Sequence, residues 1–146
     1  DFIVSDHSPC TPELKHIDTG DIEKAWGGIS ALQFGISLIW TEAKDRGFTL
    51  VDIARLMSTE TAKFAGLDSV KGAIKVGNHA DFLVFDPNLE FTITNEMIKH
   101  RHNITPYAGR KACGQVEQTF VRGQLVYQQD EFLDSPVGRP LLKGSL

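Results

Sequence analysis

The 146-residue sequence predicts an α/β fold, and three patterns support this class. The apolar run Phe2-Ile3-Val4 ends abruptly in polar residues, as a buried strand does at its carboxyl end. Apolar residues at helical spacing then occupy much of residues 28–64. Alternation typical of strands dominates residues 79–128. Helices are therefore expected in the first half and strands in the second.

The composition is that of a globular protein and excludes one class of partner. Hydrophobic residues make up 41% of the chain and charged residues 23%, which is too apolar for a disordered segment. The net charge is −4, from 15 basic and 19 acidic residues, and no basic cluster occurs. A phosphate backbone needs such a cluster, so we expect no nucleic acid partner.

Cysteine use and hydropathy indicate an intracellular protein. Cys10 and Cys113 lie far apart and show no Cys-x-x-Cys spacing, so we expect two reduced thiols rather than a disulfide framework or a structural zinc site. No apolar run approaches the roughly 18 residues of a membrane span, and no signal segment opens the chain. We expect a location in the cytoplasm or in an organelle such as a peroxisome or mitochondrion, without secretion. Because the chain begins within an expected strand and lacks an initiating Met, we expect the C-terminal part of a longer protein.

The first expected element is a buried strand over residues 2–6. It delivers Asp6, His7 and Ser8 to its carboxyl end, where α/β barrels and open α/β sheets carry their chemistry. Asp6 is therefore the foremost candidate for a functional residue. The alternative is a carboxylate that only caps a turn, because Asp-x-Ser-Pro is common in loops.

The next elements are a loop and three helices. Residues 8–27 contain two prolines and a number of charges, and loops of this length in compact domains are usually functional. A helix is expected from Gly28 to about Arg46, stopped by Gly47, because its apolar residues share one face. Thr49 is expected to cap a second helix. A short third helix over about Glu60–Phe64 ends at Gly66.

Gly66 marks the expected domain boundary, which divides the chain into residues 1–66 and residues 67–146. Alternation and turn signals predict the later elements. They are a strand over His79–Phe85 that is buried on both faces apart from Asp81, a turn at Asp86-Pro87-Asn88, a strand over Glu90–Thr94, a hairpin of Gln115–Val121 and Gln124–Gln128 about Arg122-Gly123, and an irregular tail from Asp130.

Four segments together resemble a known family. They are Asp6-His7-Ser8-Pro9-Cys10, Ala25-Trp26-Gly27-Gly28-Ile29, the Gly-x-Ile-x-x-Gly-x-x-Ala-Asp-Phe pattern from Gly72 to Phe82, and His102-Asn103-Ile104-Thr105-Pro106-Tyr107-Ala108-Gly109-Arg110. In collinear order over nearly the whole chain, they are similar to the C-terminal third of allantoinases, which are cyclic amidohydrolases of the metal-dependent amidohydrolase superfamily. The Gly-rich pattern occurs across the superfamily, whereas Asp-His-Ser-Pro with Trp-Gly-Gly indicates allantoinases.

The resemblance implies a fold and a metal centre. Residues 1–66 would form the end of a (β/α)₈ TIM barrel, with residues 2–6 as its last strand. Residues 67–146 would form the C-terminal part of a small β-sandwich and an irregular tail. Asp6 would bind one ion of a two-zinc centre and carry a proton from the metal-activated water to the leaving nitrogen.

The resemblance also implies substrate-binding residues. Ser8 matches a position that hydrogen-bonds substrate, and Gly27 and Gly28 match a loop whose main chain approaches it closely. The alternatives are an Asp-x-Ser turn bond for Ser8 and a flexible start of the helix for the glycine pair. His7 is expected only to orient its neighbours.

Most metal ligands of that family find no match in this chain. His100 and His102 have the His-x-His spacing of its metal site, but they follow a polar, helix-like segment rather than the first barrel strand, so we do not assign them to the metal. The remaining ligands are expected upstream of Asp1. The isolated chain is therefore expected to be inactive and to expose Phe2, Ile3 and Val4, whereas the full-length protein is expected to form a homo-oligomer.

Three functions compete. The first is an allantoinase, which opens the hydantoin ring of allantoin to give allantoate in purine catabolism. The second is another cyclic amidohydrolase, but dihydroorotase-like members usually carry Ala in place of Ser8 and His in place of Cys10, and dihydropyrimidinase-like or hydantoinase-like members usually carry Cys in place of Ser8. The third is a non-catalytic scaffold of the dihydropyrimidinase-related type, against which Asp6 argues.

Overall fold

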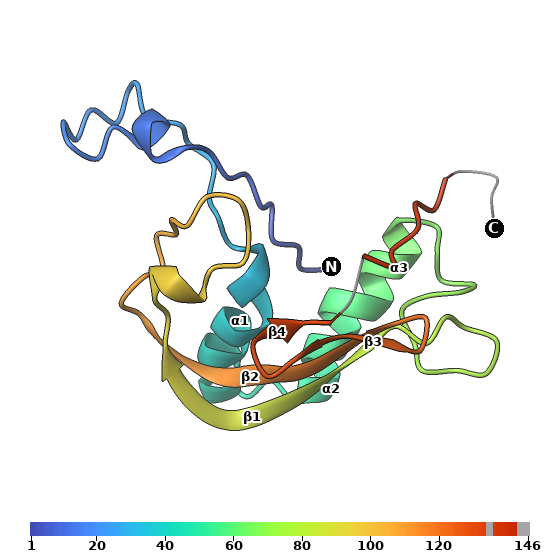
Figure 1. Ribbon diagram of the computed structural model, residues 1–146. Helices are drawn as coiled ribbons and strands as arrows, with labels where there is room; N and C mark the ends of the chain where they lie inside the picture. Colours follow the sequence, from blue (N-terminus) through green and yellow to red (C-terminus); the bar gives the residue numbers. More distant parts are fainter. Residues whose placement is uncertain (134–135, 143–146) are drawn as a thin grey trace.

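The structure is a computed structural model that describes residues 1–133 and 136–142 (Figure 1). Its regular elements follow one another as two groups, helices first and strands second. They are α1 (Gly35–Ala43), α2 (Leu50–Ala54), α3 (Glu60–Phe64), β1 (Phe82–Thr92), β2 (Lys111–Val121), β3 (Gln124–Gln128) and β4 (Glu131–Phe132). Short 3₁₀ turns lie at Pro12–Lys15, Leu32–Phe34, Lys44–Arg46 and Asn95–Met97. In this described part of the chain, no helix is long and apolar enough to cross a membrane.

The strands form one antiparallel sheet in which, among the described residues, four strands follow the order β1-β2-β3-β4. Helix α1 packs on this sheet through Trp40, whose indole N–H donates to the carbonyl of Pro87 at 2.9 Å. A Cβ built on Gly114 of β2 would lie 2.8 Å from Trp40 Cδ1, so only glycine leaves room for this indole. The buried core lies nearby and contains Phe34, Ile93, Ile98 and Ala112.

The expected strand over residues 2–6 does not form. Its segment makes only an isolated parallel bridge between His7 and Ile29, and the N–H of Ile3 donates to the carbonyl of Leu56 at 3.0 Å. Phe2 and Val4 are 39% and 62% exposed, as expected for the isolated chain, whereas Ile3 is only partly exposed, which differs from the expectation. A strand needs backbone partners on both edges to be buried, and the described residues provide only a single bridge.

The helical predictions are correct except at the start of the first helix and at the break expected between the second and the third. The helical segment begins at Leu32 rather than Gly28, because Ile29 pairs with His7, and it ends at Gly47 with φ of 80°. Thr49 caps α2 as predicted, and its hydroxyl and the carboxylate of Asp52 satisfy each other's backbone N–H groups. A π-helical turn over Arg55–Thr59 joins α2 to α3, so the second and third helices are continuous.

The strand predictions are correct for the hairpin and wrong for the turn before it. Arg122 and Gly123 have φ of 51° and 79°, as a two-residue hairpin requires. The Asp86-Pro87-Asn88 segment does not end a strand, because β1 continues through it as a bulge opposite Gly114. Pro87 is tolerated there because a bulge needs no ladder N–H from it.

Two further expectations for the second half need correction. The start of β1 is not buried on both faces, because three consecutive residues are exposed there: Phe82, Leu83 and Val84. The tail from Asp130 is not wholly irregular, because β4 pairs with β3. The parts of that tail at 134–135 and 143–146 lie outside the described residues.

Candidate functional site

Ser8 and Gly28, two of the four predicted site residues, lie against each other. The N–H of Ser8 donates to the carbonyl of Ile29 at 2.9 Å, which aligns the two segments in parallel. The indole N–H of Trp26 donates to the carbonyl of Ser8 at 3.2 Å. Both hydrogen bonds use the main chain of Ser8, so neither occupies its hydroxyl group.

Gly28 has no room for a side chain, and Gly27 does. A Cβ on Gly28 would collide with the carbonyl oxygen and the hydroxyl of Ser8 and would lie 2.5 Å from Trp26 Nε1. A Cβ on Gly27 would meet nothing within 4 Å among the described residues. The two adjacent glycines therefore differ: close backbone approach requires glycine at position 28 and not at position 27.

Lys15 closes the loop over residues 8–27. Its ammonium group donates to the carbonyl of Trp26 at 2.8 Å and also to the carbonyl of Gly28. The N–H of Trp26 in turn donates to the carbonyl of Leu14 at 2.7 Å. No local sequence pattern predicts this role of Lys15, whereas Trp26 belongs to the Trp-Gly-Gly motif.

His7 contacts the start of the helical segment that α1 continues. Its Nδ1 accepts hydrogen bonds from the N–H groups of Ala31 and Leu32, both at 3.1 Å. These two donors lie 24 and 25 residues away from His7 in sequence, so His7 contacts a distant segment rather than its sequence neighbours through this nitrogen. A contact of this separation leaves no signal in the local sequence.

Asp6 lies beside this contact, exposed and in an unusual backbone conformation. Its φ is 46°, in the left-handed region that Asp tolerates better than most residues. Such a conformation turns the chain between the apolar run and His7, and it recurs at functional positions. Asp6 thus lies two residues before Ser8 in the sequence, and it is exposed.

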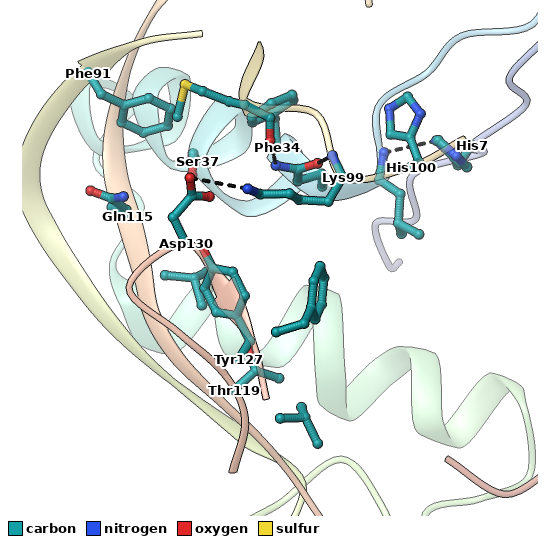
Figure 2. A pocket seen from close by; sticks show the side chains of 16 residues that line it. His7, Phe34, Ser37, Phe91, Lys99, His100, Gln115, Thr119, Tyr127 and Asp130 are labelled. Atoms are coloured by element: carbon teal, nitrogen blue, oxygen red, sulfur yellow. Dashed lines mark hydrogen bonds and ion pairs between the residues drawn. The ribbon is translucent and has the colours of Figure 1, made fainter. Parts of the chain in front are cut away.

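A cavity of about 380 Å³ lies on the other side of His7, between the helical segment and the sheet (Figure 2). Lys99 reaches across it to Asp130, with Nζ 3.2 Å from the carboxylate. The imidazoles of His7 and His100 meet edge to face at its end, with ring centroids 5.1 Å apart. None of the four predicted site residues lines this cavity.

The position of His100 disfavours protonation of its imidazole. Burial lowers the pKa of its imidazole, and the nearby rings of His7 and His102 lower it further. Its Nδ1 is buried and has no hydrogen-bond partner among the described residues. The two histidines therefore form an aromatic contact that includes a ring whose pKa is lowered.

Comparison with known proteins identifies the family. Residues 1–126 match the amidohydrolase family. The chain belongs to that family. It is 45% identical to an allantoinase of Streptomyces avermitilis over 97% of its own length and 43% identical to an allantoinase of Arabidopsis thaliana over 94%. A D-hydantoinase (dihydropyrimidinase) structure from Thermus sp. superimposes on 92% of the chain with a TM-score of 0.82 and 27% identity.

The resemblance to allantoinases inferred from four segments is thus confirmed by similarity over nearly the whole chain. The chain covers only part of the length of these relatives: 31% and 28% of the two allantoinases and 30% of the hydantoinase chain. The helices and the antiparallel sheet are those of part of an α/β amidohydrolase.

Amidohydrolases are generally metal-dependent, and this amidohydrolase chain does not contain a complete metal centre in its described residues. Within them, no group of three or more His, Cys, Asp and Glu side chains is arranged to hold an ion. Asp6 offers a single exposed carboxylate, and a stable site needs several ligands in fixed geometry. The residues present supply at most one ligand of a metal centre, so we derive no reaction step through a metal from them.

Proposed function

We propose that this chain is part of a cyclic amidohydrolase that hydrolyses allantoin to allantoate. The similarity to allantoinases over nearly the whole chain supports this proposal, and one structural observation supports it at the site. The hydroxyl-bearing residue Ser8 lies directly against the main chain of Gly28. A hydroxyl in this position suits a hydantoin ring, which presents alternating N–H and C=O groups.

In this proposal Asp6 accepts a proton from the attacking water and returns it to the leaving ring nitrogen. A carboxylate within hydrogen-bond reach of both atoms can perform both transfers. Ser8 and the main chain at Gly27 and Gly28 bind the ring. Asp6 also supplies one ligand of a two-zinc centre whose other ligands lie outside this chain.

The architecture proposed for the longer protein follows the same logic. Residues 1–66 form the end of a (β/α)₈ barrel, and residues 67–146 contribute to a small β-sandwich. The exposed side chains of Phe2 and Val4 support a strand that other parts of the protein cover. An intracellular location and a homo-oligomeric state remain proposals of the same kind.

A second candidate is a hydantoinase or dihydropyrimidinase, which the fold similarity to the Thermus structure favours. Dihydroorotase-like enzymes and non-catalytic relatives are the further alternatives. Ser8 is the residue that separates them from an allantoinase in this chain. An enzyme assay on the full-length protein with allantoin, hydantoin, dihydrouracil and dihydroorotate decides between them.

The decisive variant is Ser8→Ala in the full-length protein. Loss of the hydroxyl leaves a polar group of the substrate unpaired, so kcat/KM for allantoin should fall by about 1 to 3 kcal/mol in transition-state terms. Ser69→Ala, at an exposed serine of a turn, is the control and should change nothing. An unchanged kcat/KM in Ser8→Ala would remove this residue from the site, and preference for hydantoin or dihydrouracil would favour the second candidate.

A further inference from the structure

The helical segment from Leu32 to Arg46 begins without a local cap. Ala31 holds the N-cap position, and its methyl side chain cannot accept a hydrogen bond. The first N–H groups of any helix have no partner within it and need an acceptor from elsewhere. The need is greater at Ala31, which is buried together with Ser30 and Phe34, than at Leu32, which is exposed.

His7 supplies that acceptor from a distant part of the chain. The N–H groups of Ala31 and Leu32 both donate to its Nδ1 at 3.1 Å. A nitrogen that accepts two hydrogen bonds carries no proton, which assigns the ring proton to Nε2. The edge-to-face contact with His100 holds the ring in place from the other side (Figure 2).

The same residue holds the candidate site together through its main chain. His7 bridges Ile29, and the N–H of the next residue, Ser8, donates to the carbonyl of Ile29. The segment beyond is fixed to the core, because the buried hydroxyl of Thr105 donates to the carbonyl of Ser30 at 2.7 Å. His7 is therefore the joint between the segment that carries Asp6 and Ser8 and the buried start of the helix.

We propose that His7 is a positioning residue for the reaction: its Nδ1 caps the helix at Ala31 and Leu32 and thereby fixes Asp6 and Ser8 relative to Gly28. The proposal rests on the proposed function for its catalytic consequence and on the two hydrogen bonds alone for its structural part. His7 itself does not need to touch the substrate. Its effect comes through alignment, and misplacement of reacting groups by about 1 Å can cost roughly a hundredfold in rate.

The test uses two amide variants of the full-length protein. Asn places its side-chain oxygen close to the position of Nδ1, whereas Gln carries its oxygen one carbon farther out. His7→Asn should keep kcat/KM for allantoin within about threefold of wild type, and His7→Gln should lower it by about tenfold or more. His102→Asn and His102→Gln form the matched control pair and should not differ from each other.

Hydrogen exchange of the amides of Ala31 and Leu32 gives a readout that does not depend on activity. Exchange should be faster in His7→Gln and near wild type in His7→Asn, because only the former leaves these N–H groups without an acceptor. Equal activity or equal exchange in the two variants would overturn the proposal. A wild-type protein that does not hydrolyse allantoin would instead reject the proposed function, while the exchange comparison would still decide whether His7 caps the helix.

One measurement covers the case in which His7→Gln does not fold. In wild-type protein labelled with ¹⁵N-histidine, the Nδ1 signal of His7 should be that of an unprotonated acceptor nitrogen and its Nε2 signal that of a protonated one. The reverse tautomer would overturn the proposal without any variant.

Discussion

The first 31 residues and the helix and sheet that follow them are held by different forces. The later part has a buried core, in which Ile93 is 0% exposed and packs with Phe34, Ile98 and Ala112. In the earlier part Ile17 and Ile22 are 71% and 86% exposed, and the loop projects away from the sheet (Figure 1). Its order comes instead from polar contacts.

This difference indicates which contacts fix the geometry of the candidate site. Asp6, Ser8, Gly27 and Gly28 all belong to the earlier part, where apolar burial contributes little. Their arrangement depends on a few hydrogen bonds to Lys15, Trp26 and His7 and on whatever covers this surface in a longer protein. Changes in the two parts should therefore have separable effects, one on activity and the other on stability.

The largest effect is expected at Asp6. Asp6→Asn in the full-length protein should lower kcat for allantoin by about 10²- to 10⁴-fold, because an amide cannot accept the proton that general base catalysis requires. Steady-state assays with added zinc measure this, and Asp18→Asn, an exposed carboxylate of the same loop, is the control. The fold should persist, since Asp6 is exposed. Near-normal turnover would make Asp6 a turn residue only.

A substitution in the core should lower the stability of the protein. Ile93→Ala removes methyl groups from a fully buried site and should cost about 2 to 5 kcal/mol in the stability of the sheet, as measured by native-state hydrogen exchange of the β1 and β2 amides. Ile17→Ala, on the exposed loop, should change this quantity by less than about 0.5 kcal/mol. A similar loss of stability in both variants would contradict the view that apolar burial stabilises the later part and not the first 31 residues.

The adjacent glycines Gly27 and Gly28 allow the importance of close backbone approach to be tested within the site. Gly28→Ala forces the loop away from Ser8 and should cost about 1 to 3 kcal/mol in kcat/KM for allantoin, because a packed contact must open. Gly27→Ala meets open space and should be nearly neutral. If the two variants behave alike, close approach at position 28 does not matter to the reaction.

The smallest effect is expected at the cap of α2, which belongs to the stable part. Thr49→Ala removes the hydroxyl that accepts from the N–H of Asp52 at 3.3 Å and should lower stability by about 1 kcal/mol without altering kcat. Thr49→Ser keeps the hydroxyl and should restore most of that loss. Thermal unfolding of the three proteins measures the difference, and no loss in Thr49→Ala would mean that the cap is replaced by water.

Local sequence was enough to predict the features that neighbours in the chain create. Thr49 and Asp52 form their capping box within three residues, Gly47 ends a helix by its own φ, and Arg122-Gly123 closes a hairpin. Motifs spread along the chain were also enough to indicate the family. These signals survive because each one depends on the conformation of a few adjacent residues or on their chemical type.

Tertiary contacts determined the rest. Residues 2–6 have the composition of a strand, yet pairing depends on a partner that the described chain does not provide, so they form no strand and leave Phe2 and Val4 exposed. The bulge at Pro87 depends on Gly114 of β2. The first helical segment begins at Leu32 rather than at the predicted Gly28, because Ile29 pairs with His7. Ser8 against Gly28 and His7 on Ala31 join residues 20 or more apart. Such contacts depend on distances between segments, which no periodicity or local propensity encodes.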